Sequence, residues 1–152
     1  MSWLPASFVV PEVVELAAGH HLRPIRASDV ELDYPAVMGS RERLWARYGP
    51  VWGWPPATMT FEADREDLAH HEREIAARDA FNYAVLDAGE TELLGCVYVD
   101  PPEPDSPAGT DAVVSWWVVD AALGSHLERA LEEFVPRWLC EPWGLTAVHW
   151  HP

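Results

Sequence analysis

The sequence contains few basic residues. Lysine and arginine together number 10, against 25 aspartates and glutamates, and the formal net charge is −15. A surface of this sign repels the phosphates of nucleic acids and the headgroups of anionic lipids, so the composition argues against nucleic acid and membranes as partners. The same field attracts cations such as amines, although an acidic surface that only keeps the protein in solution would also explain the charge.

The sequence also has little cysteine and no membrane-spanning run. Cys96 lies in an apolar, strand-like stretch and Cys140 near the end of a helix-like one, which is typical of buried thiols and not of a disulfide framework. No stretch of about 18 uncharged apolar residues occurs, and residues 1–11 lack the basic segment and apolar core of a signal peptide. We therefore expect a cytoplasmic protein.

The apolar residues that are present suffice for one core. Of the 152 residues, 49% are hydrophobic and nine are tryptophan, and a chain of this length can fold as one domain without disulfides or a metal. The stretch Phe8 to Leu16 is rich in β-branched residues but contains Pro11, which favours an edge strand or an extended arm. We predict such an arm or edge strand over residues 1–19 and one domain over residues 20–152.

The first part of this domain predicts a strand followed by helices. A short strand is expected over His20–Arg26, and the helix that begins near Val30 should be short or broken because it contains Pro35. A second helix should run over Arg41–Arg47. The glycines and prolines of Tyr48–Pro56 are typical of a loop.

The rest of the chain predicts a long helix and then a succession of strands. Apolar residues from Thr60 onward recur every three to four positions, which predicts a helix. Two strands joined by a hairpin turn are expected over Phe81–Leu86 and Leu93–Val99, followed by a surface connection over Asp100–Thr110. After the connection we expect an interior strand over Ala112–Val119, a helix over Ser125–Cys140 and a final strand over Leu145–Trp150.

The order of these elements resembles that of the GNAT superfamily of acyl-CoA-dependent N-acyltransferases, and the segment Trp116 to Leu131 resembles their cofactor loop. A helix N-terminus presents unpaired N–H groups and a partial positive charge, and glycine lets the backbone approach an anion closely. In the family this junction holds the pyrophosphate of acyl-CoA, while pantetheine inserts between the interior strand and the next one. The resemblance therefore implies a site for acetyl-CoA at Val118, Val119, Gly124, Ser125, His126 and Leu127.

The loop departs from the family pattern at two positions. Leu123 stands where a polar residue is usual, and His126 replaces the second small residue. A side chain at His126 takes room from phosphate oxygens, although an imidazolium there would add a favourable charge. The sequence stops at Pro152, where longer members continue with a helix that often supplies a proton-donating tyrosine. The resemblance therefore implies that this chain uses another acid, borrows one or lacks the activity.

The resemblance also implies a mechanism, which is direct transfer from the thioester to an amine without a covalent enzyme intermediate. Because an alkyl ammonium has a reference pKa near 10.4, a base must accept its proton. Asp111, at the start of the interior strand, is the candidate base, and Tyr98, on the adjoining strand, is the candidate acid or water-orienting group. The structural alternative is that Asp111 only ends a loop and Tyr98 packs with its hydroxyl in water.

Histidine and tryptophan invite further interpretations. The pairs His20–His21, His70–His71 and His149 with His151 lack metal-ligand spacing, so no metal site is predicted. The tryptophans could form an aromatic wall for a substrate or could belong to the core or to an interface, and the adjacent Trp116 and Trp117 must face opposite sides of the sheet. The high tryptophan content and an uncovered sheet edge suggest a homodimer.

Together these features predict an α/β fold with a twisted, mixed, largely antiparallel sheet flanked by helices, as in GNAT enzymes. The implied function is acyl-CoA-dependent N-acyl transfer, with acetyl-CoA as co-substrate and a small-molecule or peptide amine as acceptor. A non-catalytic GNAT-like protein that binds a ligand or partner through the same cleft is the alternative. A purely structural dimer would be favoured if the cleft were absent.

Overall fold

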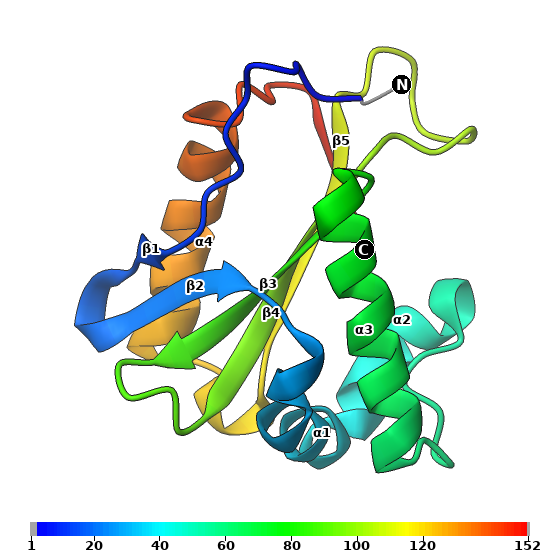
Figure 1. The fold of residues 1–152 in the computed structure, drawn as a ribbon. Coiled ribbons are helices and arrows are strands. Elements are labelled where there is room, and N and C mark those ends of the chain that lie inside the picture. Colours follow the sequence, from blue (N-terminus) through cyan, green and yellow to red (C-terminus); the bar gives the residue numbers. More distant parts are fainter. Residues whose placement is uncertain (1–2, 152) are drawn as a thin grey trace.

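The structure is a computed structural model that describes residues 3–151. Its centre is a six-stranded sheet in the order β1–β2–β3–β4–β5–β6, in which only β5 and β6 are parallel (Figure 1). This confirms the predicted α/β fold with a largely antiparallel mixed sheet. The strands are β1 (Val14–Glu15), β2 (His20–Pro24), β3 (Phe81–Asp87), β4 (Leu93–Asp100), β5 (Ala112–Val118) and β6 (Val148–Trp150).

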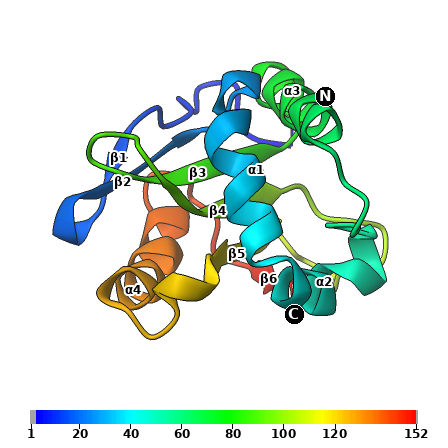
Figure 2. The same cartoon turned by 90° about the horizontal axis from the view of Figure 1, so that it is seen from below.

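Helices cover both faces of the sheet, as Figures 1 and 2 show from two directions. On one face lie α1 (Val30–Gly39), α2 (Arg41–Trp52) and α3 (Phe61–Ala77), and on the other lies α4 (His126–Cys140). Short 3-10 turns occur at η1 (Ala17–Gly19), η2 (Ala27–Asp29) and η3 (Asp120–Ala122). Over the described residues 3–151, none of the helices combines the length and apolarity needed to cross a membrane.

The sheet separates two hydrophobic cores. One core lies under α4 and includes Leu131, while the other lies under α1, α2 and α3 and includes Leu44. Trp117 belongs to the second core and the partly buried Trp116 packs against the first, which confirms that these neighbours face opposite sides. Gly95 of β4 permits the close approach of β5, because a Cβ there would lie 2.1 Å from the carbonyl oxygen of Trp117.

Two helix predictions need correction. Pro35 does not break α1, which continues for 10 residues, because its exposed position costs only one helical hydrogen bond on the solvent side. Helix α2 does not end at Arg47 but continues to Trp52, where Gly53 adopts φ +61° at its C-terminus. The rings of Tyr48 and Trp52, one turn apart, stack 4.6 Å from each other, and this packing outweighs the weak helix propensity of the segment.

The final strand is shorter than predicted. The N–H groups of Thr146 and Ala147 donate to the carboxylate of Asp111 at 3.1 and 3.0 Å, and that of Leu145 donates to the carbonyl of Leu139. These residues therefore form a turn in front of β6, and the strand begins only at Val148.

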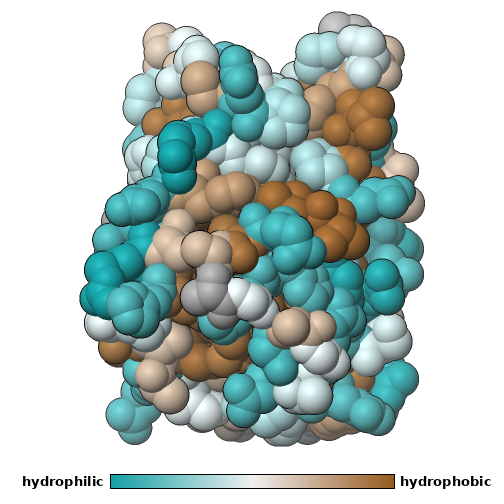
Figure 3. All heavy atoms as spheres, turned by 90° about the vertical axis from the view of Figure 1, so that its left-hand side faces the viewer, coloured by the Kyte–Doolittle hydropathy of each residue, from teal (hydrophilic) through white to brown (hydrophobic). Residues whose placement is uncertain are grey.

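The N-terminal segment lies along the molecule and adds the edge strand β1. Arg78, at the end of α3, donates to the carbonyls of Pro5 and Phe8, and the Tyr83 hydroxyl donates to the carbonyl of Pro11. Figure 3 shows the side of the molecule on which β1 lies, where hydrophilic residues cover most of the surface and apolar patches lie between them. Val9 is among the exposed apolar residues, at 81% exposure.

Candidate functional site

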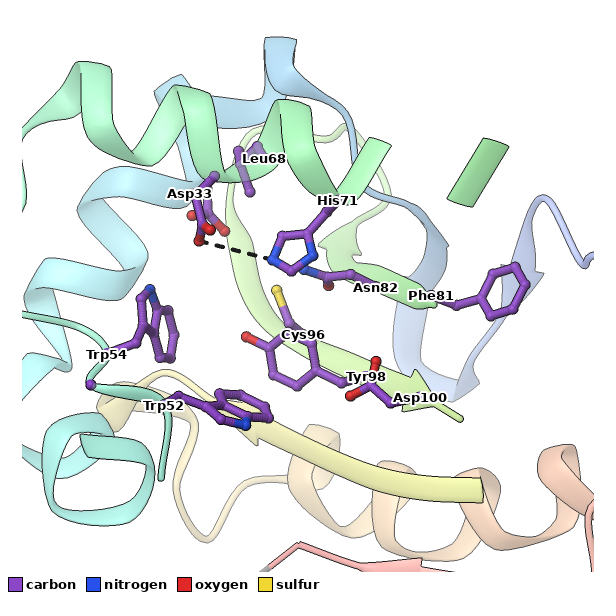
Figure 4. A pocket seen from close by; sticks show the side chains of 12 residues that line it. Asp33, Trp52, Trp54, Leu68, His71, Phe81, Asn82, Cys96, Tyr98 and Asp100 are labelled. Atoms are coloured by element: carbon purple, nitrogen blue, oxygen red, sulfur yellow. Dashed lines mark ion pairs between the residues drawn. The ribbon is translucent and has the colours of Figure 1, made fainter. Parts of the chain in front are cut away.

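A cavity of about 360 Å³ lies on the α1–α3 side of the sheet, over strands β3 and β4. Figure 4 shows the side chains that gather around it from α1, the end of α2 and the segment after it, α3, β3 and β4, while Phe81 of β3 points away from the others. The side chains that line it and carry chemistry are Asp33, Trp52, Trp54, Asp67, His71, Asn82, Cys96, Tyr98 and Asp100.

The buried end of the cavity is acidic. Asp33 of α1 is 3% exposed and Asp64 of α3 is fully buried, and burial together with the charge of the other group raises the pKa of Asp33 well above its usual value. Burial also raises the pKa of Asp64, to about 6. Asp67, one turn along α3, lines the cavity and adds to both shifts. Burial and like charge therefore disfavour the ionised form of Asp33 and of Asp64.

Asp100 is the acid at the other end. It is the last residue of β4, and Figure 4 shows it on the opposite side of Cys96 and Tyr98 from Asp33. Burial of its carboxyl, with the neighbouring charges of Glu74 and Glu103, raises the pKa of Asp100 to about 7. A carboxyl with such a pKa can both accept and release a proton near neutral pH.

Aromatic side chains form the wall between the two ends. The Tyr98 hydroxyl accepts a hydrogen bond from Trp117 Nε1 at 2.8 Å, and burial raises the pKa of Tyr98 well above its usual value. Trp52, 36% exposed, meets the Tyr98 ring edge-on at 5.2 Å, and Trp54 lies 6.2 Å from the ring of Trp117. Such faces attract cations and pack against methylene groups.

Two buried polar atoms of the cavity wall have no hydrogen-bond partner in the protein. They are Oδ1 of Asn82, a residue 3% exposed on β3, and Nε1 of Trp54. An unsatisfied buried polar group costs free energy of about 1–3 kcal/mol. Both atoms are therefore available to a ligand that enters the cavity.

His71 and Cys96 complete the lining. The ring nitrogens of His71 lie 3.9 Å from an oxygen of Asp67 and 3.3 Å from one of Glu74. Burial raises the pKa of the Cys96 thiol well above its usual value, so Cys96 is a poor nucleophile. Over residues 3–151, no group of three or more histidine, cysteine, aspartate or glutamate side chains is placed to hold a metal ion.

The edge of β5 beside this cavity is only partly paired with β6. Three alternate carbonyls of β5 point toward that side: the backbone N–H of His151 donates to Val114 at 2.8 Å, Arg47 Nη1 to Trp116 at 2.7 Å, and Arg43 Nη2 to Val118. Arg43 and Arg47 lie one turn apart on α2. Their guanidinium groups thus continue the hydrogen bonding of the sheet edge where β6 ends.

The junction between β5 and α4 has the predicted strand-to-helix geometry. Gly124 adopts φ +72°, and its N–H donates to the Glu128 carboxylate at 2.9 Å, while Ser125 Oγ accepts from the N–H of Glu128 and caps the helix. Arg129 donates to the carbonyl of Gly124 and contacts Nδ1 of the exposed His126. The Glu128 carboxylate therefore already accepts a hydrogen bond from the Gly124 N–H, one of the N–H groups at the opening of this helix.

Of the predicted site residues, Tyr98 lines the cavity, while the six expected to hold the cofactor lie outside its lining. Val118 ends β5, and Val119 follows it and leads through η3 to Gly124, Ser125, His126 and Leu127, the last of which is a buried residue of α4. Tyr98 pairs in register with Ser115, next to the open part of the β5 edge, and lines the cavity.

Asp111, the predicted base, also lies outside the lining of this cavity. Its carboxylate accepts hydrogen bonds from Thr146 and Ala147 at the turn before β6, and these bonds lower its pKa. A lowered pKa makes a carboxylate a weaker base.

Sequence reasoning did not single out Asp33, Asp67, Asn82 or Asp100. Asp33 was expected in a helix and Asp100 at the start of a surface connection. A signal was nevertheless present, because Asp33 is spaced three and four residues from the buried Val30 and Val37 and thus falls on the buried face of α1. An acid at a core position of a helix is uncommon unless it is paired or functional.

Comparisons with known proteins identify the fold. No family model matches the sequence, and no curated protein matches it. Among solved structures, the ribosomal-protein-S5-alanine acetyltransferase from Vibrio fischeri aligns with a TM-score of 0.64 at 20% identity, over 89% of this chain and 70% of its own. An acetyltransferase from Salmonella typhimurium that modifies the N-terminal serine of ribosomal protein L7/L12 aligns with a TM-score of 0.66 at 14% identity, over 85% and 68%.

A third neighbour binds a small amine. The spermidine N-acetyltransferase from Vibrio cholerae, solved with CoA and spermine, aligns with a TM-score of 0.58 at 13% identity, over 84% of this chain and 68% of its own. A GNAT-family acetyltransferase from Bordetella pertussis is also among the similar structures. At these identities the likeness establishes the fold, which is that of the GNAT acetyltransferases, as the sequence resemblance implied.

Proposed function

We propose that this protein is an acetyl-CoA-dependent N-acetyltransferase that acts on a small-molecule or peptide amine. The observation that supports this most directly is the position of the acidic, aromatic cavity over β4, next to β5: Tyr98 of the cavity pairs with Ser115 of β5, whose opposite edge is only partly paired with β6. An amine is a cation at neutral pH, and Asp33, Asp67 and Asp100 give the cavity the complementary charge. The acceptors named for the structural neighbours, protein N-termini and spermine, agree with this class.

In this proposal Asp100 is the general base and Tyr98 the general acid. Asp100, with a pKa of about 7, accepts the proton of the entering ammonium group at neutral pH. Tyr98 is protonated throughout the physiological range, and because its oxygen accepts from Trp117 it can donate its own proton. Asp111, the base expected from the sequence, is the alternative that must be tested against Asp100.

The bound thioester would supply the acetyl group: the new N–C bond forms as the C–S bond breaks, and the departing thiolate takes up one proton. No residue of the protein need be acetylated on the way, in keeping with the poorly nucleophilic Cys96. The residues that would hold acetyl-CoA are the backbone of Val118 and Val119 and the helix opening at Gly124, Ser125, His126 and Leu127.

The backbone of this region fits acetyl-CoA, but three side chains must move. Arg43 and Arg47 hydrogen-bond to the β5 carbonyls that a pantetheine chain would use, and Glu128 holds the N–H of Gly124. Arginine and glutamate side chains have several rotatable bonds, so these three side chains can leave their positions. Binding of acetyl-CoA therefore requires rearrangement of side chains and not of the fold.

Isothermal titration with acetyl-CoA tests the proposal. We expect saturable binding to the unmodified protein and its loss in Gly124→Trp, because an indole would block the helix opening. Gly109→Trp is the matched control, since Gly109 also has a positive φ (+83°) and an open Cβ direction but lies in the connection between β4 and β5. Equal loss in both variants, or no binding at millimolar acetyl-CoA, would contradict the cofactor assignment.

A non-catalytic, ligand-binding protein is the second candidate, and the Arg43, Arg47 and Glu128 contacts favour it. If these side chains keep their places, the acidic cavity can still bind an amine while the β5 edge stays closed. Amine binding without acetyl-CoA binding would identify this case. Product formation should be followed by mass spectrometry, because the exposed thiol of Cys140 reacts with reagents that detect free CoA.

The proposal includes two further points. The cytoplasm is the proposed compartment, because Cys96 and Cys140 are both free thiols. A homodimer is proposed because β6 is the last strand in the order of the sheet and its Trp150 is 41% exposed. Light scattering coupled to size exclusion should give twice the monomer mass, and Trp150→Glu should reduce it to the monomer value.

A further inference from the structure

The cavity has acidic groups at two separated ends. Cys96 and Asp100 lie four residues apart on β4, which at the usual rise of a strand is roughly 13 Å. Asp33 lies near enough to Cys96 to raise the pKa of its thiol, so it marks the Cys96 end. Figure 4 shows Asp33 and Asp100 on opposite sides of Tyr98. Any cation held at one acid is therefore well separated from the other.

Unsatisfied hydrogen-bonding capacity indicates that a ligand enters between these ends. The Oδ1 atom of Asn82 is a buried acceptor without a partner, and the residue is 3% exposed and lines the cavity. An N–H donor of a ligand would satisfy it. Since Asn82 sits beside Tyr98 in the β3–β4 register, this acceptor lies in the same part of the cavity as the acids.

The stretch between the ends favours an apolar chain. Its walls are the rings of Tyr98 and Trp52, which meet edge-on at 5.2 Å, and the buried side chain of Leu68. Methylene groups pack favourably against such surfaces, at about 0.8 kcal/mol for each buried CH₂.

We propose that the cavity binds a linear diamine, with one ammonium group at the Asp33–Asp67 end, a methylene chain along Tyr98 and Trp52, and the second nitrogen at Asp100. Binding of the diamine does not depend on the proposed function. The one part that rests on it is that the nitrogen at Asp100 is the nitrogen that becomes acetylated. Because Asp33 and Asp100 lie at opposite ends of the cavity, a chain of intermediate length is favoured over a very short one.

Isothermal titration without acetyl-CoA tests the inference independently of catalysis. The probes are 1,6-diaminohexane, 1,3-diaminopropane, hexylamine and hexan-1-ol. We expect 1,6-diaminohexane to bind about tenfold more tightly than hexylamine, because the second charge gains a charged partner. The short diamine should bind like a monoamine, and the alcohol should not bind detectably.

Substitutions at the Asp33–Asp67 end should remove the preference. Asp67→Asn is the first choice, because the Asp67 side chain is 44% exposed and its replacement should not disturb folding. Asp33→Asn is the second, since the amide is close in shape to the carboxyl group that it replaces and lacks its acidity. Both variants should bind 1,6-diaminohexane no better than hexylamine. The matched control is Glu66→Gln, an exposed acid on the same helix that does not line the cavity.

The outcomes separate this inference from the proposed function. Equal affinities of hexylamine and 1,6-diaminohexane for the unmodified protein would overturn the diamine assignment even if acetyl transfer occurs. Equal weakening in Glu66→Gln and Asp67→Asn would also overturn it, because the general acidic field would then account for binding. Diamine selectivity without acetyl-CoA binding would support the inference while excluding the acetyltransferase.

Discussion

At the scale of single residues, the surroundings of two aspartates decide which can act as a base. Asp111 accepts hydrogen bonds from backbone N–H groups that favour its ionised form, which lowers its pKa. Asp100 is buried near other acids, which raises its pKa to about 7. The same residue type thus serves as a turn-stabilising anion in one place and as a proton acceptor in the other.

Replacement of Asp100 should therefore remove the general base. We expect Asp100→Asn to lower kcat for acetyl transfer at least tenfold, within the usual range of general base catalysis. In the unmodified enzyme kcat should rise with pH through about 7 as Asp100 ionises, and this rise should vanish in the variant. Asp111→Asn should lower the melting temperature slightly and leave the pH profile unchanged. If the rise of kcat with pH is instead lost in Asp111→Asn, the general base is Asp111.

A second prediction concerns stability and the ion pairs of Arg23. This buried guanidinium contacts Asp29 at 2.7 Å and Glu90 at 3.0 Å, and Glu90 also contacts His21 at 2.7 Å. Hydrogen bonds from Arg23 and His21 lower the pKa of Glu90 to about 2. The stabilisation is therefore complete above the ordinary glutamate pKa of 4.5 and is lost as the pH falls toward 2.

Glu90→Gln should consequently cost about 1 kcal/mol of unfolding free energy at pH 7, a modest value because the Glu90 side chain is 37% exposed and water screens the pair. Urea unfolding at pH 7 and pH 3 measures the effect. The difference between variant and parent should shrink at the lower pH. Glu92→Gln, in the same turn, is the control and should show neither effect; a cost for Glu90→Gln that is independent of pH would refute the electrostatic explanation.

At the scale of elements, side chains of α2 supply hydrogen bonds to β5 that a neighbouring strand would otherwise supply. Its residues Arg43 and Arg47 bind the outward carbonyls of β5 that β6 does not reach. The helix can do this because Tyr48 and Trp52 extend it across the open edge, where Tyr48 bonds with Ser115 of β5. The edge of a sheet is thus covered by side chains instead of backbone.

Removal of one guanidinium tests this view. Arg47→Ala should lower the stability by about 1 kcal/mol, since the Trp116 carbonyl loses its charged donor. It should also strengthen acetyl-CoA binding several-fold, because the β5 edge no longer has to be vacated. Thermal unfolding and isothermal titration measure the two effects. Arg41→Ala is the control, as Arg41 packs over the ring of Trp45. Weaker acetyl-CoA binding in Arg47→Ala would mean that Arg47 holds the ligand.

The elements themselves were largely predictable, and the site was not. Strands β3, β4 and β5 and helix α3 follow from local hydrophobic patterns, and the glycine junction at Gly124 gave the family resemblance. The extension of α2 to Trp52 depends on aromatic contacts between distant segments, which no local pattern records. The acidic cavity likewise forms only when Asp33 and Asp100, 67 positions apart, meet over one strand pair.

At the scale of the whole molecule, the charge of −15 should act on the ligand before it reaches the cavity. All 10 basic residues are arginines, and several of them are engaged in ion pairs or carbonyl contacts, among them Arg23, Arg43, Arg47 and Arg78. The surface field is therefore strongly negative and draws a cationic amine from a distance of about one Debye length, roughly 10 Å at 0.1 M salt and 3 Å at 1 M.

Salt should therefore weaken the binding of a diamine more than that of a monoamine. Between low salt and about 0.5 M sodium chloride, we expect the Kd of 1,6-diaminohexane to rise several-fold and that of hexylamine to rise about half as much on a logarithmic scale, because the doubly charged ligand interacts twice as strongly with the same potential. Stopped-flow measurements should place most of the change in the association rate, since the contacts inside the cavity are shielded from salt. Equal salt dependence for both ligands would show that only one charge of the diamine senses the protein, which contradicts a binding mode with an acid at each end.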